Sequence, residues 1–199
     1  MTRWRSYIIE LLLRNHMIIK EEREIYEFGL NCLVLKGIHC VSYFCIAAML
    51  GMIPELLIIG CVLIPLRRNA GGYHARTKIG CYVFSCTYIF IILLISRVFD
   101  QLFVCFMALA LADGIIIRYS PVDNENKRLD EKEFLYYRKK SRILLIAINL
   151  CCFTLSFLLN TFLVYPIGPL LSLGVCASAF LLILEKSKEI VKLWRHELS

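Results

Sequence analysis

Six long apolar segments, separated by short polar or charged stretches, limit the folds open to this chain of 199 residues. Several of them approach the ~20 residues that a helix needs to cross the hydrocarbon core of a bilayer. Hydrophobic residues make up 59% of the chain, above the roughly one half that is usual in globular proteins. The sequence therefore predicts an all-α polytopic membrane protein with about six transmembrane helices. The expected spans are residues 29–50, 53–66, 80–97, 101–118, 143–164 and 166–184.

The second segment is short for a complete span, so a helix there is expected to tilt, kink near Pro54 or Pro65, or thin the bilayer. Residues 1–28 combine apolar side chains at roughly helical spacing with several arginines, which predicts one or two amphipathic helices. These helices would lie in the membrane interface or pack as soluble helices on the rest of the protein. Charged residues interrupt any signal-peptide core, so we expect no cleaved leader. We predict a single integral membrane domain over residues 1–199, with spans within 29–184 and a cytoplasmic tail at 185–199.

Lysine and arginine are distributed unevenly between the polar stretches. Nearly all of the 23 lie in the N-terminal region, in residues 67–78 and 118–142, or in the tail, whereas the connections near 51–53 and 164–166 have none. Six spans place all the basic stretches on one side, which the positive-inside rule assigns to the cytoplasm together with both termini. This basic face could attract anionic lipid or an acidic peptide, although membrane insertion alone would also select it.

Ten cysteines occur, and most of them lie inside the apolar segments. A free cysteine in such a setting behaves as a small hydrophobic residue, so a disulfide framework is not expected. No CxxC motif is present, and the sequence predicts no metal site and no cofactor.

A polar, glycine-rich stretch, residues 67–81, joins the second apolar segment to the third. It contains His74 and Cys81, and this pair is our candidate catalytic centre. A cysteine protease requires a thiolate beside an imidazole, which acts as base towards the thiol and then as acid towards the leaving amine. A helix N-terminus and nearby cations favour the thiolate form. Cys81 follows Gly80 at the expected start of a helix, shortly after Lys78.

The seven-residue spacing of His74 and Cys81 imposes a condition on the backbone. Along a continuous α-helix the two side chains would share a face but stand about 10.5 Å apart along the axis, too far for a hydrogen bond. We therefore predict that the helix is interrupted between them. Gly71, Gly72 and Gly80 make such a path sterically easy.

Two patterns of residues together resemble the signature of a known family. The first is a basic pair, two glycines, a histidine after one further residue, and a cysteine seven residues later, which here are Arg67-Arg68, Gly71-Gly72, His74 and Cys81. The second is the run Pro121-Val122-Asp123-Asn124-Glu125-Asn126-Lys127. Both are similar to motifs of the accessory gene regulator protein B family, bacterial membrane endopeptidases that process quorum-sensing propeptides. The chain length, the apolar segments and the amphipathic start fit that family over nearly the whole chain.

The resemblance implies a bacterial cell-membrane enzyme that cuts a small propeptide. Cys81 would attack a peptide bond with the help of His74 and form a thioester acyl-enzyme. An internal Cys or Ser of the precursor would then displace the enzyme and close a thiolactone or lactone ring. The resemblance also implies a short amphipathic propeptide with an acidic C-terminal part as substrate, and a homodimer.

Residues close to the candidate pair could have supporting roles. Arg67 and Arg68 could bind a carboxylate of the precursor or serve as a topological anchor. Asn69, or backbone amides near Gly71 and Gly72, could form an oxyanion hole. By resemblance, the second motif supplies further candidates for substrate binding or support, namely Pro121, Asp123, Asn126 and Lys127.

Asp113 and His39 lie inside expected spans, where a charge is costly. Asp113 could orient His74, pair with a basic residue, or lie near the interface. The sequence indicates no partner for His39 in the first span, and we expect it to be structural.

Two other classes of function are compatible with the sequence, a small peptide transporter or exporter and a non-enzymatic membrane scaffold. A transporter needs a polar path across the bilayer, and the spans offer few candidates apart from Asp113, Asn149 and Asn160. The basic run Arg138-Lys139-Lys140 is explained better by the positive-inside rule than by nucleic-acid binding, which we do not expect.

Overall fold

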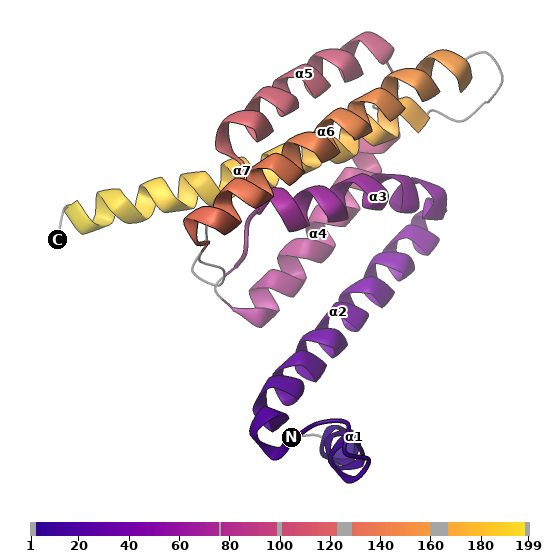
Figure 1. The fold of residues 1–199 in the computed structure, drawn as a ribbon. Coiled ribbons are helices and arrows are strands. Elements are labelled where there is room, and N and C mark those ends of the chain that lie inside the picture. Colours follow the sequence, from indigo (N-terminus) through magenta and orange to yellow (C-terminus); the bar gives the residue numbers. More distant parts are fainter. Residues whose placement is uncertain (1–2, 76, 99–100, 123–128, 160–166, 198–199) are drawn as a thin grey trace. The chain divides into compact units, whose positions relative to one another are not determined.

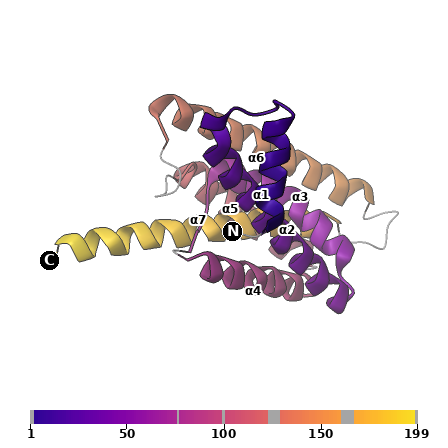
Figure 2. The same ribbon diagram turned by 90° about the horizontal axis from the view of Figure 1, so that it is seen from below.

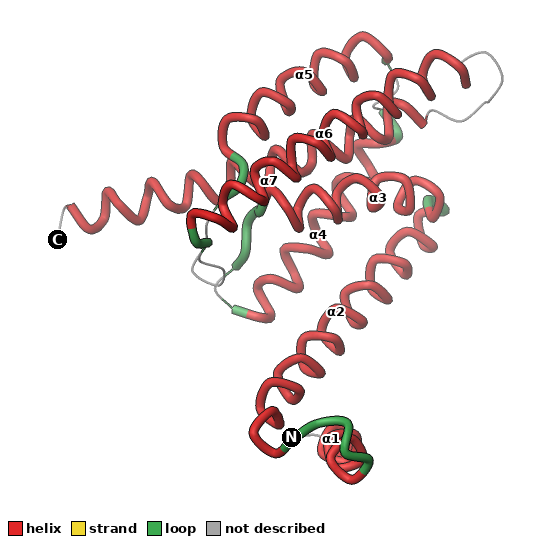
Figure 3. Tube along the Cα trace, viewed as in Figure 1, coloured by secondary structure: helices red, strands yellow, loops and turns green. Residues whose placement is uncertain are grey.

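The computed structural model describes residues 3–75, 77–98, 101–122, 129–159 and 167–197, and helices dominate these ranges (Figures 1 and 3). Within them the α-helices are α1 (Arg3–Arg14), α2 (Arg23–Leu50), α3 (Ile53–Ala70), α4 (Lys78–Ser96), α5 (Leu102–Tyr119), α6 (Glu131–Leu159) and α7 (Ile167–Glu197). A short 3-10 helix, η1 (Lys20–Glu22), precedes α2. The all-α class is thereby confirmed. Three candidate residues lie outside the described ranges, namely Asp123, Asn126 and Lys127.

The described parts of the six predicted apolar segments coincide with helices α2 to α7. Four helical stretches in the described chain are long and apolar enough to cross a membrane: Lys20–Leu50, Lys78–Ser96, Glu131–Phe157 and Ile167–Lys192. In α3, only 18 residues long, Glu55 at one end and Arg67 and Arg68 at the other shorten the apolar stretch. The protein is therefore a membrane protein of the α-helical type, but a count of six spans is not confirmed.

Several helix ends differ from the predicted ones because charged residues continue an apolar helix. α2 begins at Arg23, inside the region expected to be interfacial, and α6 begins at Glu131, well before its apolar part. α7 continues to Glu197 through the segment expected to be a tail. Glu, Lys and Arg are good helix formers, whereas apolar periodicity marks only the part of a helix that is buried in lipid or protein.

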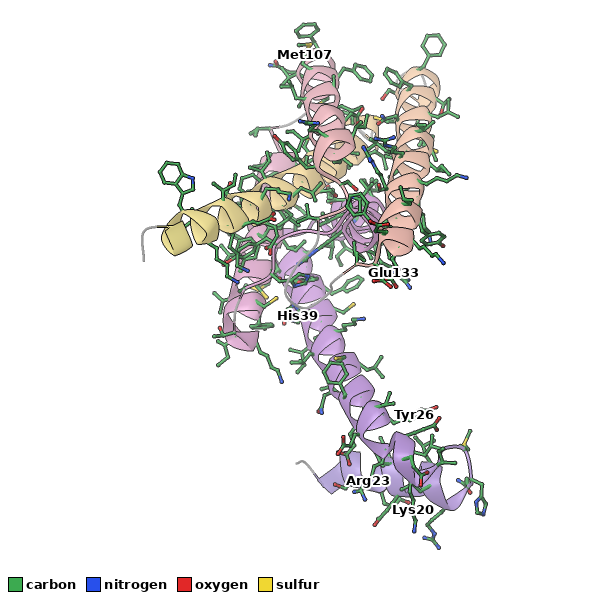
Figure 4. The ribbon with its side chains drawn as sticks, turned by 60° about the vertical axis from the view of Figure 1, so that its left-hand side comes forward. Lys20, Arg23, Tyr26, His39, Met107 and Glu133 are labelled. Carbon is green, nitrogen blue, oxygen red and sulfur yellow. The ribbon has the colours of Figure 1, made fainter. Side chains whose placement is uncertain are left out.

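By backbone contacts the chain divides into two compact units, Met1–Cys45 and Ile46–Ser199. In the first unit an apolar groove of about 400 Å³ lies between α1 and the start of α2, lined by residues that include Ile9, Leu12 and Leu30. Figure 4 shows polar side chains projecting around η1 and the beginning of α2. The prediction that His39 lacks a partner is wrong. Its Nδ1 lies 3.0 Å from the Tyr43 hydroxyl, because residues four apart share one face of a helix.

α7 is the central helix of the second unit. It contacts α3, α4, α5 and α6, and α4 and α5 flank it from opposite sides (Figures 1 and 2). In the most apolar part of α7, 67% of the residues are buried within the protein. In each of the other three candidate spans the corresponding share is 22% or less. Small residues on α7 allow its neighbours to approach closely, as is usual between helices in membranes. The core around it includes Val62, Leu66, Leu109, Ile116, Leu145, Val175 and Leu182.

Gly174 marks the closest approach of α7 to α3. A Cβ atom at this position would lie 2.8 Å from Val62 Cβ and 3.2 Å from the Ile59 carbonyl oxygen. Overpacking of this kind costs about 1–3 kcal/mol. This is more than the roughly 1 kcal/mol that Ala gains over Gly through its higher helix propensity. We therefore expect Gly174→Ala to lower the thermal unfolding temperature in detergent micelles. Gly114 of α5 is a matched control, since nothing lies within 4 Å of a Cβ there. Gly114→Ala should raise the unfolding temperature, and equal shifts at both positions would contradict the close packing.

Candidate functional site

The connection between α3 and α4 contains the predicted interruption of the helix. α3 ends at Ala70 and α4 begins at Lys78, and the described residues between them are not helical (Figure 3). Gly71 ends α3 with φ +88°, and its N–H donates to the Arg67 carbonyl at 3.1 Å. A Cβ at Gly71 would lie 2.9 Å from the Val122 carbonyl oxygen. Both the left-handed backbone and this contact require glycine.

α4 starts with a side-chain cap that places Cys81 in its first turn. Thr77 has the extended backbone of an N-cap residue, and its hydroxyl oxygen accepts a hydrogen bond from the Gly80 N–H at 3.0 Å. The Cys81 N–H then donates to the Thr77 carbonyl at 2.9 Å. The half-buried Cys81 thiol thus belongs to the positive end of a helix dipole, which favours negative charge.

An aromatic contact links the two halves of the candidate pair. Tyr73 immediately precedes His74, Phe84 follows Cys81 by one helical turn, and the centroids of these two rings are 4.7 Å apart. The loop that carries His74 therefore packs against α4 one helical turn beyond Cys81. The stack continues to α7 through Phe84, Tyr88 and Phe180, with centroid separations of 5.8 and 6.1 Å.

α7 holds the loop by hydrogen bonds to its backbone. The Tyr73 N–H donates to the Leu181 carbonyl at 3.1 Å, and the His74 N–H donates to Glu185 Oε2 at 3.3 Å. The His74 carbonyl accepts from Lys188 Nζ at 3.0 Å. A Cβ at Gly72 would lie 3.3 Å from Leu181 Cβ, so a glycine here lets the chain run close along α7.

The two arginines at the end of α3 differ in their exposure to solvent. Arg67 is half-buried, and its guanidinium donates to the Tyr73 carbonyl at 2.9 Å. Arg68 is exposed. The Asn69 side-chain amide is buried and donates to the Pro65 carbonyl at 2.7 Å. Arg67 therefore supports the loop, and Arg68 is the member of the pair that solvent or a ligand can reach.

The start of the second motif lies beside the first. Pro121 and Val122 are buried, and the Val122 N–H donates to the Ala70 carbonyl at 3.0 Å. The Ser120 hydroxyl, one residue earlier, donates to the Ser141 hydroxyl of α6 at 2.9 Å. The two motifs are distant in sequence, yet the ends of α3 and α5 bring them into contact.

Asp113 is placed by the structure in a hydrogen bond between α5 and α6. The Asn149 side-chain amide donates to Asp113 Oδ2 at 2.7 Å. The partner that the structure gives Asp113 among the described residues is therefore the neutral amide of Asn149, not a basic residue and not His74. The carboxylate that touches the His74 residue is Glu185.

The surroundings of His74 favour its neutral form. Burial lowers the pKa of His74 below its ordinary value of 6.5, and the Arg67 guanidinium lowers it further. The Glu185 carboxylate opposes this change by raising the pKa, while the Lys188 ammonium lowers it. A neutral imidazole at pH 7 can accept a proton from a thiol.

Comparison with known proteins shows which family this chain belongs to. The family model for accessory gene regulator B (AgrB) matches residues 6–183. The chain belongs to the AgrB family. A putative AgrB-like protein from Clostridium beijerinckii is 32% identical over 125 residues, which cover 61% of this chain and 62% of that relative. The chain thus spans about three-fifths of the length of this curated relative. No solved structure matches the chain.

Membership of the AgrB family confirms the resemblance found in the sequence. Sequence reasoning missed Glu185 and Lys188, which lie more than 100 residues from His74 and inside the expected tail. The one available signal was an acid directly after an apolar run, since Glu185 follows Leu184 at the end of the last segment.

If His74 acts as the base for the Cys81 thiol, its protonation should limit the acylation rate only at a pH below about 6.5. His74 must be neutral to accept the thiol proton, and its folded-state pKa lies below the ordinary value. The same lowered pKa also makes the folding stability depend on pH. The contribution of neutral His74 is intact above pH 6.5 and is lost as the pH falls further, because the unfolded chain takes up the proton first.

Arg67→Gln removes the largest electrostatic cause of the lowered pKa of His74, so the acid limb of the pH–rate profile should move to higher pH. Single-turnover cleavage measured between pH 4 and 8 checks this shift. Arg68→Gln, at the exposed neighbouring position, should leave the limb where it is. An acid limb that stays in place in Arg67→Gln would contradict the assigned electrostatics.

Proposed function

We propose that this AgrB-family protein is a membrane cysteine endopeptidase in which Cys81 is the nucleophile and His74 the general base and acid. The observation that carries the proposal is the broken helix. Because α3 ends at Ala70 and α4 begins at Lys78, the His–Cys pair has a path to meet that a continuous helix would deny. The contact between the ring of Tyr73, next to His74, and the ring of Phe84, one helical turn after Cys81, supports the same geometry.

The proposed reaction conserves atoms and charge at each step. His74 takes the proton of the Cys81 thiol, and the sulfur attacks the carbonyl carbon of a peptide bond in the precursor. The carbon–nitrogen bond breaks, His74 gives its proton to the leaving amine, and the N-terminal fragment stays on Cys81 as a thioester. An internal thiol or hydroxyl of that fragment then attacks the thioester, closes a thiolactone or lactone ring, and returns a proton to the Cys81 sulfur.

The proposed substrate is a short amphipathic propeptide whose C-terminal part is acidic. Basic side chains suit this part because guanidinium groups bind carboxylates in two places, and exposed Arg68 stands at the end of α3 beside the loop. We further propose that the site faces the cytoplasm in the bacterial cell membrane, with both termini on that side and the protein acting as a homodimer. The orientation is supported by the contacts that join the basic stretches 67–78, 118–142 and 185–197.

A trapping experiment tests this function. The chain is co-expressed with a short amphipathic propeptide that has an acidic C-terminal part. The ring-closing Cys or Ser of that propeptide is replaced by Ala so that the thioester persists. We expect mass spectrometry to find the N-terminal fragment attached to the peptide that contains Cys81. The adduct should be absent in Cys81→Ala and present in Cys86→Ala, a neighbouring half-buried thiol on α4. An adduct on another cysteine would sink the assignment.

A further inference from the structure

Two charged residues of α7 hold both backbone polar groups of one loop residue. Glu185 Oε2 accepts from the His74 N–H at 3.3 Å, and Lys188 Nζ donates to the His74 carbonyl at 3.0 Å. The two side chains also form an ion pair, with Nζ and Oε1 3.6 Å apart. From this arrangement we propose that Glu185 and Lys188 are positioning residues that set the orientation of His74. The proposal rests on the function proposed above.

Burial distinguishes this ion pair from an ordinary surface pair. Glu185 is only 7% exposed, and a buried carboxylate is costly unless it is paired and hydrogen-bonded. Its two oxygens have separate partners, the His74 N–H and the Lys188 ammonium. Removing Glu185 would therefore leave a partly buried backbone N–H and a partly buried ammonium without their acceptor.

Fixing the backbone at residue 74 fixes the direction in which its imidazole leaves the chain. Reacting groups must be held closely, and a misplacement of 1 Å can cost about a hundredfold in rate. Three further contacts hold the same loop, namely Tyr73 N–H to the Leu181 carbonyl, Arg67 to the Tyr73 carbonyl, and the Lys188 ammonium 5.6 Å from the Tyr73 ring centroid. We call Glu185 and Lys188 together the clamp. The clamp and these three contacts all act on residues 73 and 74.

The charges of the clamp act on His74 in opposite directions, since Glu185 favours the imidazolium and Lys188 disfavours it. Among the described residues, Arg67 on α3 is a further charged group that lowers the pKa of His74. Because the two clamp charges oppose each other, the clamp fixes the position of the imidazole with a smaller change in its pKa than the Glu185 charge would cause alone.

A second ion pair on α7 provides a matched control. Lys186 Nζ and Glu189 Oε2 are 2.6 Å apart at the same three-residue spacing, but their side chains are 35% and 51% exposed. Glu189→Ala therefore removes a carboxylate from the same helix and the same kind of pair without touching the loop. Glu185→Gln is the conservative variant, because its amide oxygen can still accept from the His74 N–H.

Hydrogen exchange tests the clamp directly and needs no substrate. In the full-length protein in micelles, Glu185→Ala should speed exchange of the amides at residues 73–75 by about tenfold or more, as expected when a local hydrogen bond is lost. The exchange rate of these amides in Glu185→Gln should stay within a few-fold of the wild-type rate, and the rate in Glu189→Ala should equal the wild-type rate. Unchanged exchange in Glu185→Ala, or equal acceleration in Glu189→Ala, would overturn the clamp.

Alkylation of Cys81 by iodoacetamide, followed by peptide mass spectrometry between pH 5 and 9, tests the consequence for chemistry. We expect His74→Ala to slow the reaction at neutral pH, Glu185→Ala to approach that slow rate, and Glu185→Gln to recover most of it. If Glu185→Ala alkylates like the wild type while His74→Ala is slow, the positioning role is wrong. If His74→Ala itself alkylates like the wild type, the proposed His–Cys pair is wrong, and the exchange result still decides whether the clamp exists.

Discussion

Replacing Cys81 by alanine should lower the rate of propeptide cleavage by about four orders of magnitude or more. Loss of a covalent nucleophile removes the acyl-enzyme route itself, and effects of this size are typical when such a residue is deleted. The measurement is single-turnover cleavage of the co-purified propeptide, followed by mass spectrometry. Cleavage by Cys81→Ala at more than a hundredth of the wild-type rate would exclude Cys81 as the nucleophile.

Two further variants separate the chemistry from a general effect on folding. His74→Ala should reduce the rate by about 10²–10⁴-fold, the usual contribution of general acid–base catalysis. Cys86→Ala changes a half-buried thiol on the same helix and should leave the rate within a few-fold of the wild type. Equal losses in Cys81→Ala and Cys86→Ala, with less protein in the membrane, would indicate a packing role for both.

Gly71→Ala should also lower cleavage strongly, because two independent constraints meet at this residue. Its φ of +88° with ψ of −167° is a conformation that is almost restricted to glycine, and holding another residue there costs about 1–3 kcal/mol. A Cβ would also lie 2.9 Å from the Val122 carbonyl oxygen. Val122 cannot retreat without losing its hydrogen bond to the Ala70 carbonyl at 3.0 Å. We expect a lower unfolding temperature and, since the loop carrying His74 must move, a loss of cleavage of about a hundredfold.

Gly51 is the control for backbone strain alone. It also has a positive φ, of +68°, but nothing lies within 4 Å of a Cβ built there. Gly51→Ala should cost roughly 1–2 kcal/mol of stability and leave the intrinsic cleavage rate of the folded protein unchanged. A similar loss of cleavage in both variants would mean that the contact between Gly71 and Val122 does not position the site.

The sequence predicted the helical class, the family and the interruption between His74 and Cys81. It predicted these correctly because each depends on local information, namely apolar periodicity, a motif within fifteen residues, and the geometry of one helix. Helix ends were predicted less well. Apolar segments do not show where a helix continues into water, as α6 does from Glu131 and α7 does to Glu197.

What the sequence by itself determined is the candidate pair and the glycines, Gly71 and Gly72, that end α3 just before His74. Only the tertiary structure decided what holds that turn in place. Glu185 and Lys188 are more than 100 residues from His74, and Val122 is about fifty residues from Gly71. No local pattern encodes such contacts, because they form only when α3, α5 and α7 pack with these ends together. The helix break therefore follows from residue types, while its fixed position depends on long-range hydrogen bonds that packing creates.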